Sequence, residues 1–141
     1  MNGFVLGASV SAAWFLPHPD TEYALEVRQK LADGSKALVP GLWPLEMANA
    51  LARAARKNIL TTEAADYAIR QLEILFLSGP RIEIEGGIVS VRQAYTAART
   101  LQLTAYDGVY VELAQREGLP LATLDKDMRA AAKKVGVELL T

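Results

Sequence analysis

The chain has 141 residues, and a composition of 51% hydrophobic and 22% charged residues excludes an intrinsically disordered protein. Lys and Arg total 15 against 16 Asp and Glu, so the net charge is −1 and binding of a nucleic acid would need local basic residues or bound cations. There is no cysteine, which excludes disulfides, thiol nucleophiles and thiolate metal sites. The length predicts one domain spanning residues 1–141.

The apolar run FVLGASVSAAWFLP near the start has the composition of the hydrophobic part of a signal peptide. However, no Lys or Arg precedes Arg28, and the run is too short to span a bilayer. We therefore expect a soluble, cytoplasmic protein.

The first half of the chain alternates short apolar strands with amphipathic helices. The expected elements are a buried strand at residues 4–6, a helix from Gly7-Ala8 through Phe15, a helix at 21–31, a strand at 37–39 and a helix from Pro44 to Lys57. Pro17 and Pro19 end the first of these helices, and Asp33-Gly34 ends the second.

The second half continues the alternation. We expect a helix capped by Thr61 or Thr62 and broken by Gly79-Pro80, an edge strand at 81–85, helices at 89–101 and 107–115, a strand at 120–124, a basic helix at 126–135 and a possible last strand at 137–140. Gly118 occupies the position of a C-terminal helix cap. Strands that alternate with helices of this length predict βαβ units and a mainly parallel sheet, hence an α/β fold.

Carboxylates recur where a parallel sheet forms its ligand site, beyond the carboxyl ends of the strands. Asp125 follows a strand, Asp107 begins a helix, and Glu46 opens another. Each acid alone is explained as a helix cap or a first-turn residue that interacts with the helix dipole. Together they would repel one another unless cations or protons intervened, which favours a metal site.

Other polar residues accompany these acids. Asn49 and Arg53 follow Glu46 on one helix face, while Ser9 and Thr123 place hydroxyls near the strand ends. The remaining candidates are an additional acid, Asp127, and two basic residues of the last helix, Lys126 and Arg129, which with Arg53 could bind phosphate or simply form a solvated face. Trp14, Trp43, Tyr106 and Tyr110 are read as core or dimer residues.

Several motifs together resemble the PIN-domain ribonucleases, and most of all the VapC-type toxins of toxin–antitoxin pairs. The motifs are Gly7-Ala8-Ser9, Glu46 followed by Asn49, Thr104-Ala105-Tyr106-Asp107 and Thr123-Leu124-Asp125. The resemblance extends from Val5 to Leu139, and the combination of TAYDG with LPLATLD is more specific than any one acid in it.

The resemblance implies a three-layer α/β/α fold with a mainly parallel sheet of four or five strands, and a homodimer. It also implies an endoribonuclease in which a water activated by Mg²⁺ or Mn²⁺ cleaves RNA phosphodiesters, and a VapB-type antitoxin that blocks the enzyme. The implied catalytic and metal-binding residues are Glu46, Asp107 and Asp125, supported by Ser9, Asn49, Thr123 and Asp127.

Gly7 departs from the family pattern, which has an aspartate at the end of the first strand. Glycine offers no side-chain oxygen, so one ligand position is vacant and we expect a weak or inactive nuclease. One alternative is a catalytically dead PIN-fold module that only binds an antitoxin. A more distant alternative is a response-regulator-like domain, although Gly7-Ala8 replaces the acidic pair of such domains and RIEIEGG ends without their phosphoacceptor aspartate.

Overall fold

A parallel β-sheet forms the centre of the protein in the computed structural model, which describes residues 3–77, 81–85 and 90–141. In the described residues the sheet has four strands in the order β3-β2-β1-β4, and every neighbouring pair is parallel. The strands are β1 (Gly3–Leu6), β2 (Lys36–Val39), β3 (Ile82–Ile84) and β4 (Leu121–Ala122). The short β3 lies at an edge, as its alternating sequence predicted.

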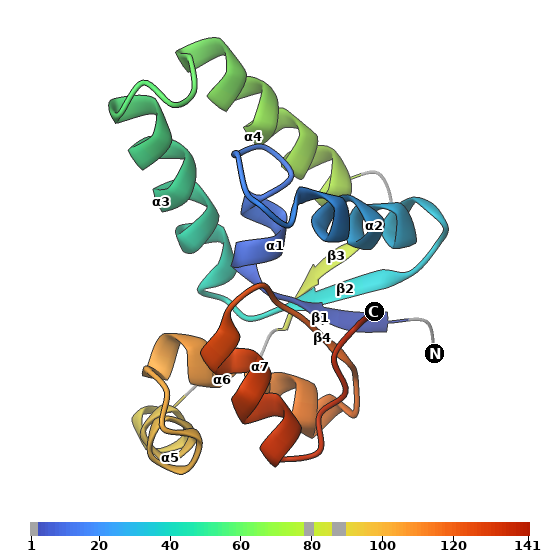
Figure 1. The fold of residues 1–141 in the computed structure, drawn as a ribbon, viewed down its shortest axis with the longest axis vertical. Coiled ribbons are helices and arrows are strands. Elements are labelled where there is room, and N and C mark those ends of the chain that lie inside the picture. The colour runs from blue at the N-terminus through green and yellow to red at the C-terminus, as the bar shows by residue number, and fades with distance from the viewer. Residues whose placement is uncertain (1–2, 78–80, 86–89) are drawn as a thin grey trace.

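Helices cover both faces of this sheet (Figure 1). One layer contains α1 (Ala8–Ala12), α2 (Thr21–Ala32), α3 (Trp43–Arg56) and α4 (Thr62–Leu77). The opposite layer contains α5 (Val91–Leu101), α6 (Ala105–Glu117) and α7 (Lys126–Lys134). The expected three-layer α/β/α architecture is therefore confirmed.

Burial on both faces explains why β1 is an uninterrupted apolar run. Phe4, Val5 and Leu6 are each no more than 1% exposed, because α6 packs on one side of the strand and α1 and α2 lie on the other. The largest fully buried side chains are Trp43 and Tyr110, which bring α3 and α6 into the same core.

The first helix is shorter than predicted, ending at Ala12 rather than continuing through Phe15. The indole nitrogen of Trp14 donates a hydrogen bond to the carbonyl oxygen of Ala24 at 2.8 Å, and the ring is buried. This contact directs the chain towards α2 before Pro17 is reached.

The other helix boundaries follow local capping chemistry. The Thr61 hydroxyl accepts a hydrogen bond from the Ala64 amide at 3.0 Å, and Ser90 and Gln93 form a reciprocal capping box at the start of α5. Gly118 ends α6 with a left-handed φ of 66°, as expected. The predicted helix start at Val89 and the predicted break at Gly79-Pro80 lie outside the described residues.

The last part of the chain contains less β-strand than the sequence predicted. The strand expected at 120–124 covers only Leu121–Ala122, because the backbone amides of Leu124 and Asp125 donate to side-chain hydroxyls instead of a neighbouring strand. The segment expected as a strand at 137–140 forms an isolated parallel bridge between Leu139 and Leu121.

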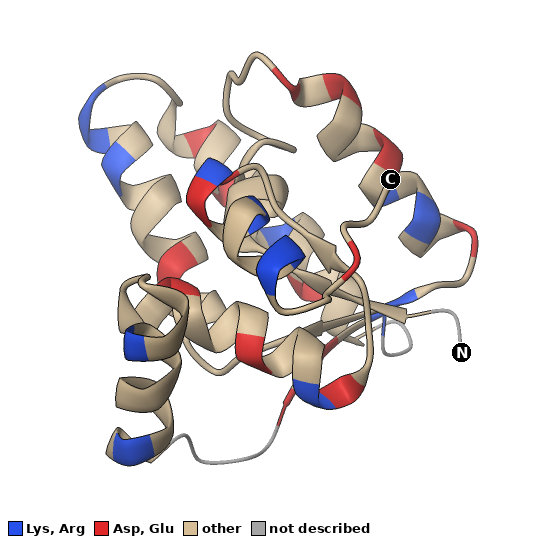
Figure 2. Ribbon diagram, turned by 60° about the horizontal axis from the view of Figure 1, so that its bottom comes forward, with Lys and Arg blue, Asp and Glu red and all other residues tan. Residues whose placement is uncertain are grey.

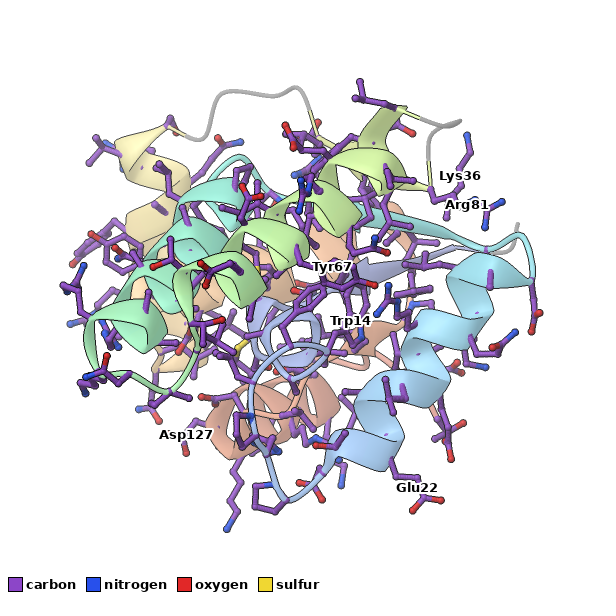
Figure 3. All side chains as sticks on the ribbon, turned by 90° about the horizontal axis from the view of Figure 1, so that it is seen from above. Trp14, Glu22, Lys36, Tyr67, Arg81 and Asp127 are labelled. Carbon is purple, nitrogen blue, oxygen red and sulfur yellow. The ribbon has the colours of Figure 1, made fainter. Side chains whose placement is uncertain are left out.

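Charged residues lie at both ends of the sheet. Lys36 and Arg81 lie beside each other where β2 and β3 begin, and Asp127 lies at the opposite end of the molecule (Figure 3). Asp127 belongs to α7, the helix that follows β4. No helix in the described part of the chain is both long and apolar enough to cross a bilayer.

Candidate acidic site

Three acids from three helices face the carboxyl ends of the strands. Glu46 lies in the first turn of α3, Asp107 in the first turn of α6, and Asp125 is the N-cap of α7. The charge of Asp107 raises the pKa of Glu46, and the charge of Asp125 raises the pKa of Asp107. The fold has therefore brought these three carboxyl groups into one electrostatic neighbourhood.

Glu46 is half-buried and hydrogen-bonded to a tyrosine. The Tyr110 hydroxyl donates to Oε1 of Glu46 at 2.6 Å. Burial raises the pKa of Glu46, the hydrogen bond from Tyr110 lowers it, and the nearby Asp107 raises it again. The net direction is upward, so this carboxyl group holds a proton to a higher pH than an exposed glutamate would.

Asp107 was expected to begin or to cap its helix, but it does neither. The helix begins at Ala105 and Thr104 is the N-cap, whose hydroxyl accepts a hydrogen bond from the Asp107 amide at 3.1 Å. Since the cap position is already filled, the Asp107 carboxylate is not needed for capping. Its pKa is raised by burial and by Asp125, and Thr104 partly offsets this rise.

Asp125 is a true N-cap. Its Oδ1 accepts a hydrogen bond from the Met128 amide at 2.9 Å. Its own backbone amide donates to the Thr123 hydroxyl at 3.1 Å. The helix-capping role predicted for Asp125 is therefore confirmed. The capping bond uses Oδ1 and does not involve Oδ2.

A group of hydrogen bonds holds the turn between β4 and α7 that carries Asp125. Ser9 Oγ accepts a hydrogen bond from the Leu124 amide at 3.0 Å and lies 3.4 Å from the Thr123 hydroxyl. Arg129 Nε donates to the Thr123 carbonyl at 2.8 Å, and its guanidinium lies 5.2 Å from the ring centre of Tyr23. Ser9 and Thr123 thus hold the turn in place, and part of the Arg129 side chain has a structural use.

Gly7 follows the last residue of β1, at the position where the motif resemblance led us to expect an aspartate. The residue is buried with φ −72° and ψ 143°, a conformation open to any amino acid. Its amide donates to the Ala122 carbonyl at 2.8 Å, and a Cβ atom added to Gly7 would also lie 2.8 Å from that oxygen. Close approach of β4, rather than backbone conformation, favours glycine here.

The remaining candidates from the sequence are on the surface. Asn49 and Arg53 are exposed on α3, as Lys126 and Asp127 are on α7. A buried Asn49 would have required a hydrogen-bonding partner, but the residue is solvated. Charges of both signs are spread over all three layers and along α7 itself (Figure 2).

Tyr110 contacts an acid of the site, although it was predicted only as a core or dimer residue. It follows Asp107 by three positions, and residues three apart lie on the same face of a helix. That spacing was the available signal that Tyr110 would reach the acids.

The donor set has the chemistry of a site for Mg²⁺ or Mn²⁺, because such cations prefer carboxylate oxygens. Burial is the main cause of the raised pKa values of Glu46 and Asp107, and neighbouring acids add a smaller rise that a cation would relieve. Within residues 3–77, 81–85 and 90–141, no three His, Asp or Glu side chains already lie close enough together to hold an ion. The residues therefore fit the cation in ligand type and charge, without a preformed cluster.

The site and the fold together define a three-layer α/β/α protein with acidic residues at the carboxyl ends of its parallel strands. Residues 4–134 match the PIN domain family, and the chain belongs to that family. This confirms the resemblance inferred from the motifs and disfavours the response-regulator-like alternative.

Two proteins of Pyrobaculum aerophilum are similar to this chain. Ribonuclease VapC3 is 27% identical over 124 residues, which cover 88% of this chain and 90% of that protein. The crystal structure of PAE2754 has a TM-score of 0.68 with 22% sequence identity, covering 93% of this chain and 80% of the other. The second similarity supports the fold alone.

Proposed function

We propose that this protein is a VapC-type toxin, an endoribonuclease that depends on Mg²⁺ or Mn²⁺. The observation that carries the proposal is the placement of Glu46 in the first turn of α3, Asp107 in the first turn of α6 and Asp125 at the start of α7, in a chain of the PIN domain family. The similarity to a protein named Ribonuclease VapC3 over most of both chains supports RNA as the substrate.

In this proposal Glu46, Asp107 and Asp125 hold the cation. When bound, the cation activates a water molecule and neutralises charge on the scissile phosphate. Ser9 and Thr123 fix the turn that presents Asp125, because their hydroxyls accept hydrogen bonds from the backbone amides of Leu124 and Asp125. Weaker roles are assigned to five further residues: polar support to Asn49 and Asp127, and contact with RNA phosphates to the exposed Arg53 and Lys126 and the partly buried Arg129.

Activity of this chain should be low because residue 7 contributes no oxygen. Loss of a group that only supports a metal ligand lowers metal affinity or activity by roughly 10–100-fold, and loss of a ligand should cost at least as much. The Ala122 carbonyl lies so close to residue 7 that a side chain there would require the backbone to shift. The site therefore either binds the cation through three carboxylates or is inactive.

The proposed partners are an RNA substrate, a VapB-type antitoxin and a second copy of the chain, in the cytoplasm. A groove of about 330 Å³ between α3 and α4 supports a peptide partner, since its lining is almost entirely apolar and includes Met47, Leu51 and Ile69. A second apolar hollow, lined by Leu42 and the exposed Tyr106, supports the homodimer. Trp43 cannot contribute much to a dimer surface because it is only 1% exposed.

The proposal is tested by incubating the purified chain with fluorescently labelled single-stranded RNA and Mn²⁺ or Mg²⁺. Slow cleavage that disappears with EDTA and in Asp107→Asn is the expected result. Cleavage that persists in Asp107→Asn would show a contaminating nuclease or a different active site, and the proposed site would be wrong.

The second candidate is a PIN-fold module that binds an antitoxin without cleaving RNA. The close packing at Gly7 favours it, because glycine is accommodated there without strain and an aspartate would require β1 and β4 to move apart. Tight binding of an antitoxin peptide by a chain that cleaves no RNA, even as Gly7→Asp, would support this candidate over the enzyme.

A further inference from the structure

We propose that Tyr110 is a positioning residue that fixes the Glu46 carboxylate in the orientation the metal site requires. The inference rests on the proposed function and adds to it a residue on α6 that the motif resemblance did not assign. The carrying observation is the hydrogen bond of 2.6 Å from the Tyr110 hydroxyl to Oε1 of Glu46.

Packing in the core holds the Tyr110 side chain in place independently of its hydrogen bond to Glu46. It is 2% exposed and belongs to the main hydrophobic core, on the buried face of α6 next to Val109 and Val111. A ring packed on all sides has little freedom to rotate, so its hydroxyl has a fixed position. Tyr110 therefore acts as a rigid donor aimed at the start of α3.

Two helices from opposite layers meet at this hydroxyl, since Tyr110 comes from α6 and Glu46 from the first turn of α3. Burial and Glu46 raise the pKa of Tyr110, and the backbone of Ala8, at the start of α1, partly offsets this rise. Ala8 directly follows Gly7, so the phenol also lies near the ligand position that has no carboxylate. The hydrogen bond therefore joins one proposed ligand to the helix of Asp107.

A glutamate in the first turn of a helix has three side-chain torsions to restrict before it can bind an ion. The short hydrogen bond engages Oε1 and restricts those torsions, so less side-chain entropy is lost when an ion binds. Partners that orient a metal-binding side chain typically contribute 10–100-fold to metal affinity or activity. Tyr110 should contribute within roughly that range.

The test is a double-mutant cycle on the full chain, with Tyr110→Phe, Glu46→Gln and the double variant. Mn²⁺ binding is followed by electron paramagnetic resonance of the free ion, so that the measurement needs no catalytic activity. Tyr110→Phe keeps the ring in the core and removes only the hydroxyl. Thermal unfolding of each variant verifies that it is folded.

The expected result is a loss of roughly 10-fold or more in Mn²⁺ affinity in Tyr110→Phe. The same substitution should have no further effect in the Glu46→Gln background, because there is no carboxylate left to position. Tyr23→Phe is the matched control, since it also removes a partly buried hydroxyl bond, in this case one of 2.8 Å to the Leu140 carbonyl. Its effect should be the same in both backgrounds.

Mn²⁺ affinity within twofold of the wild type in Tyr110→Phe would overturn the inference and leave the proposed function standing. An equal loss of affinity with and without the Glu46 carboxylate would also overturn it, since that pattern indicates a general role in the core. Absence of Mn²⁺ binding by both the wild type and Gly7→Asp would instead overturn the proposed function, and the inference with it.

Discussion

The carbonyl oxygen of Ala122 lies where a side chain on Gly7 would have to begin. It accepts the Gly7 amide at 2.8 Å and would lie 2.8 Å from a Cβ atom at that residue. Because the conflict is with backbone, it cannot be relieved by rotation of a flexible side chain. The end of β1 and the end of β4 would have to separate before any larger residue fits.

Gly7→Ala should therefore destabilise the protein, although its backbone conformation suits alanine. Overpacking of this kind costs about 1–3 kcal/mol, which exceeds the roughly 0.4–1 kcal/mol gained when glycine is replaced in the unfolded chain. Urea unfolding of the two proteins measures the difference. A Gly7→Ala protein as stable as the wild type would show that β4 yields easily and that sterics do not favour glycine.

Asp125 can be separated into its capping and charge roles. Asparagine caps a helix about as well as aspartate, so Asp125→Asn should keep the melting temperature while lowering Mn²⁺ affinity and RNA cleavage by at least tenfold. Asp125→Ala should in addition lose about 0.5–2 kcal/mol of stability because the bond from the Met128 amide is lost. Unchanged Mn²⁺ affinity in Asp125→Asn would remove this residue from the proposed ligands.

Ser9→Ala should act on the turn that carries Asp125. The substitution leaves the Leu124 amide without its acceptor, and an unsatisfied donor costs about 1–3 kcal/mol. Denaturant unfolding measures this loss, and Ser90→Ala, which removes an exposed capping hydroxyl on α5, is the comparison. If Ser9→Ala costs no more than a few tenths of a kcal/mol, water has replaced the hydroxyl and the turn does not depend on it.

Stability should fall with rising pH because of Glu46. Its folded pKa is raised above the ordinary value of 4.5, so the folded state binds the proton more tightly than the unfolded state does. The associated stability is present below pH 4.5 and is lost as pH rises through the raised pKa. Glu46→Gln, whose amide oxygen can still accept the Tyr110 hydrogen bond, should melt above the wild type at pH 7 and equally with it at pH 4.

Melting curves of the two proteins from pH 4 to pH 7 provide this measurement. Saturating Mn²⁺ should reverse the order at pH 7, because only the carboxylate gains from the cation. A difference between wild type and Glu46→Gln that is constant across the pH range would contradict the raised pKa.

Periodicity was sufficient to predict the α/β fold because each strand is a short apolar run and each helix has an amphipathic stripe. Edge placement of RIEIE and the cap at Gly118 depend on local chemistry, and both were predicted correctly. The end of β4 could not be predicted, because the hydroxyl that ends its pairing belongs to Ser9, more than a hundred residues earlier.

The candidate site was predicted as a set of residue types rather than as a geometry. Spacing placed Glu46, Asp107 and Asp125 at strand ends, but a helix starting at Asp107 was expected where Thr104 provides the cap. The contact of Tyr110 with Glu46 joins positions 64 residues apart, so the spacing from Asp107 could place Tyr110 on the side of the acids but could not identify Glu46 as its partner.

The most direct test of a ribonuclease site weakened at residue 7 is Mn²⁺-dependent RNA cleavage by Gly7→Asp beside Gly7→Asn. The two side chains have nearly the same size and meet the same Ala122 carbonyl, so they differ chiefly in the charge offered to a cation. Cleavage by folded Gly7→Asp should exceed that of both Gly7→Asn and the wild type by at least tenfold. Equal cleavage by the folded aspartate and asparagine variants would contradict the claim that residue 7 is the missing ligand of this site.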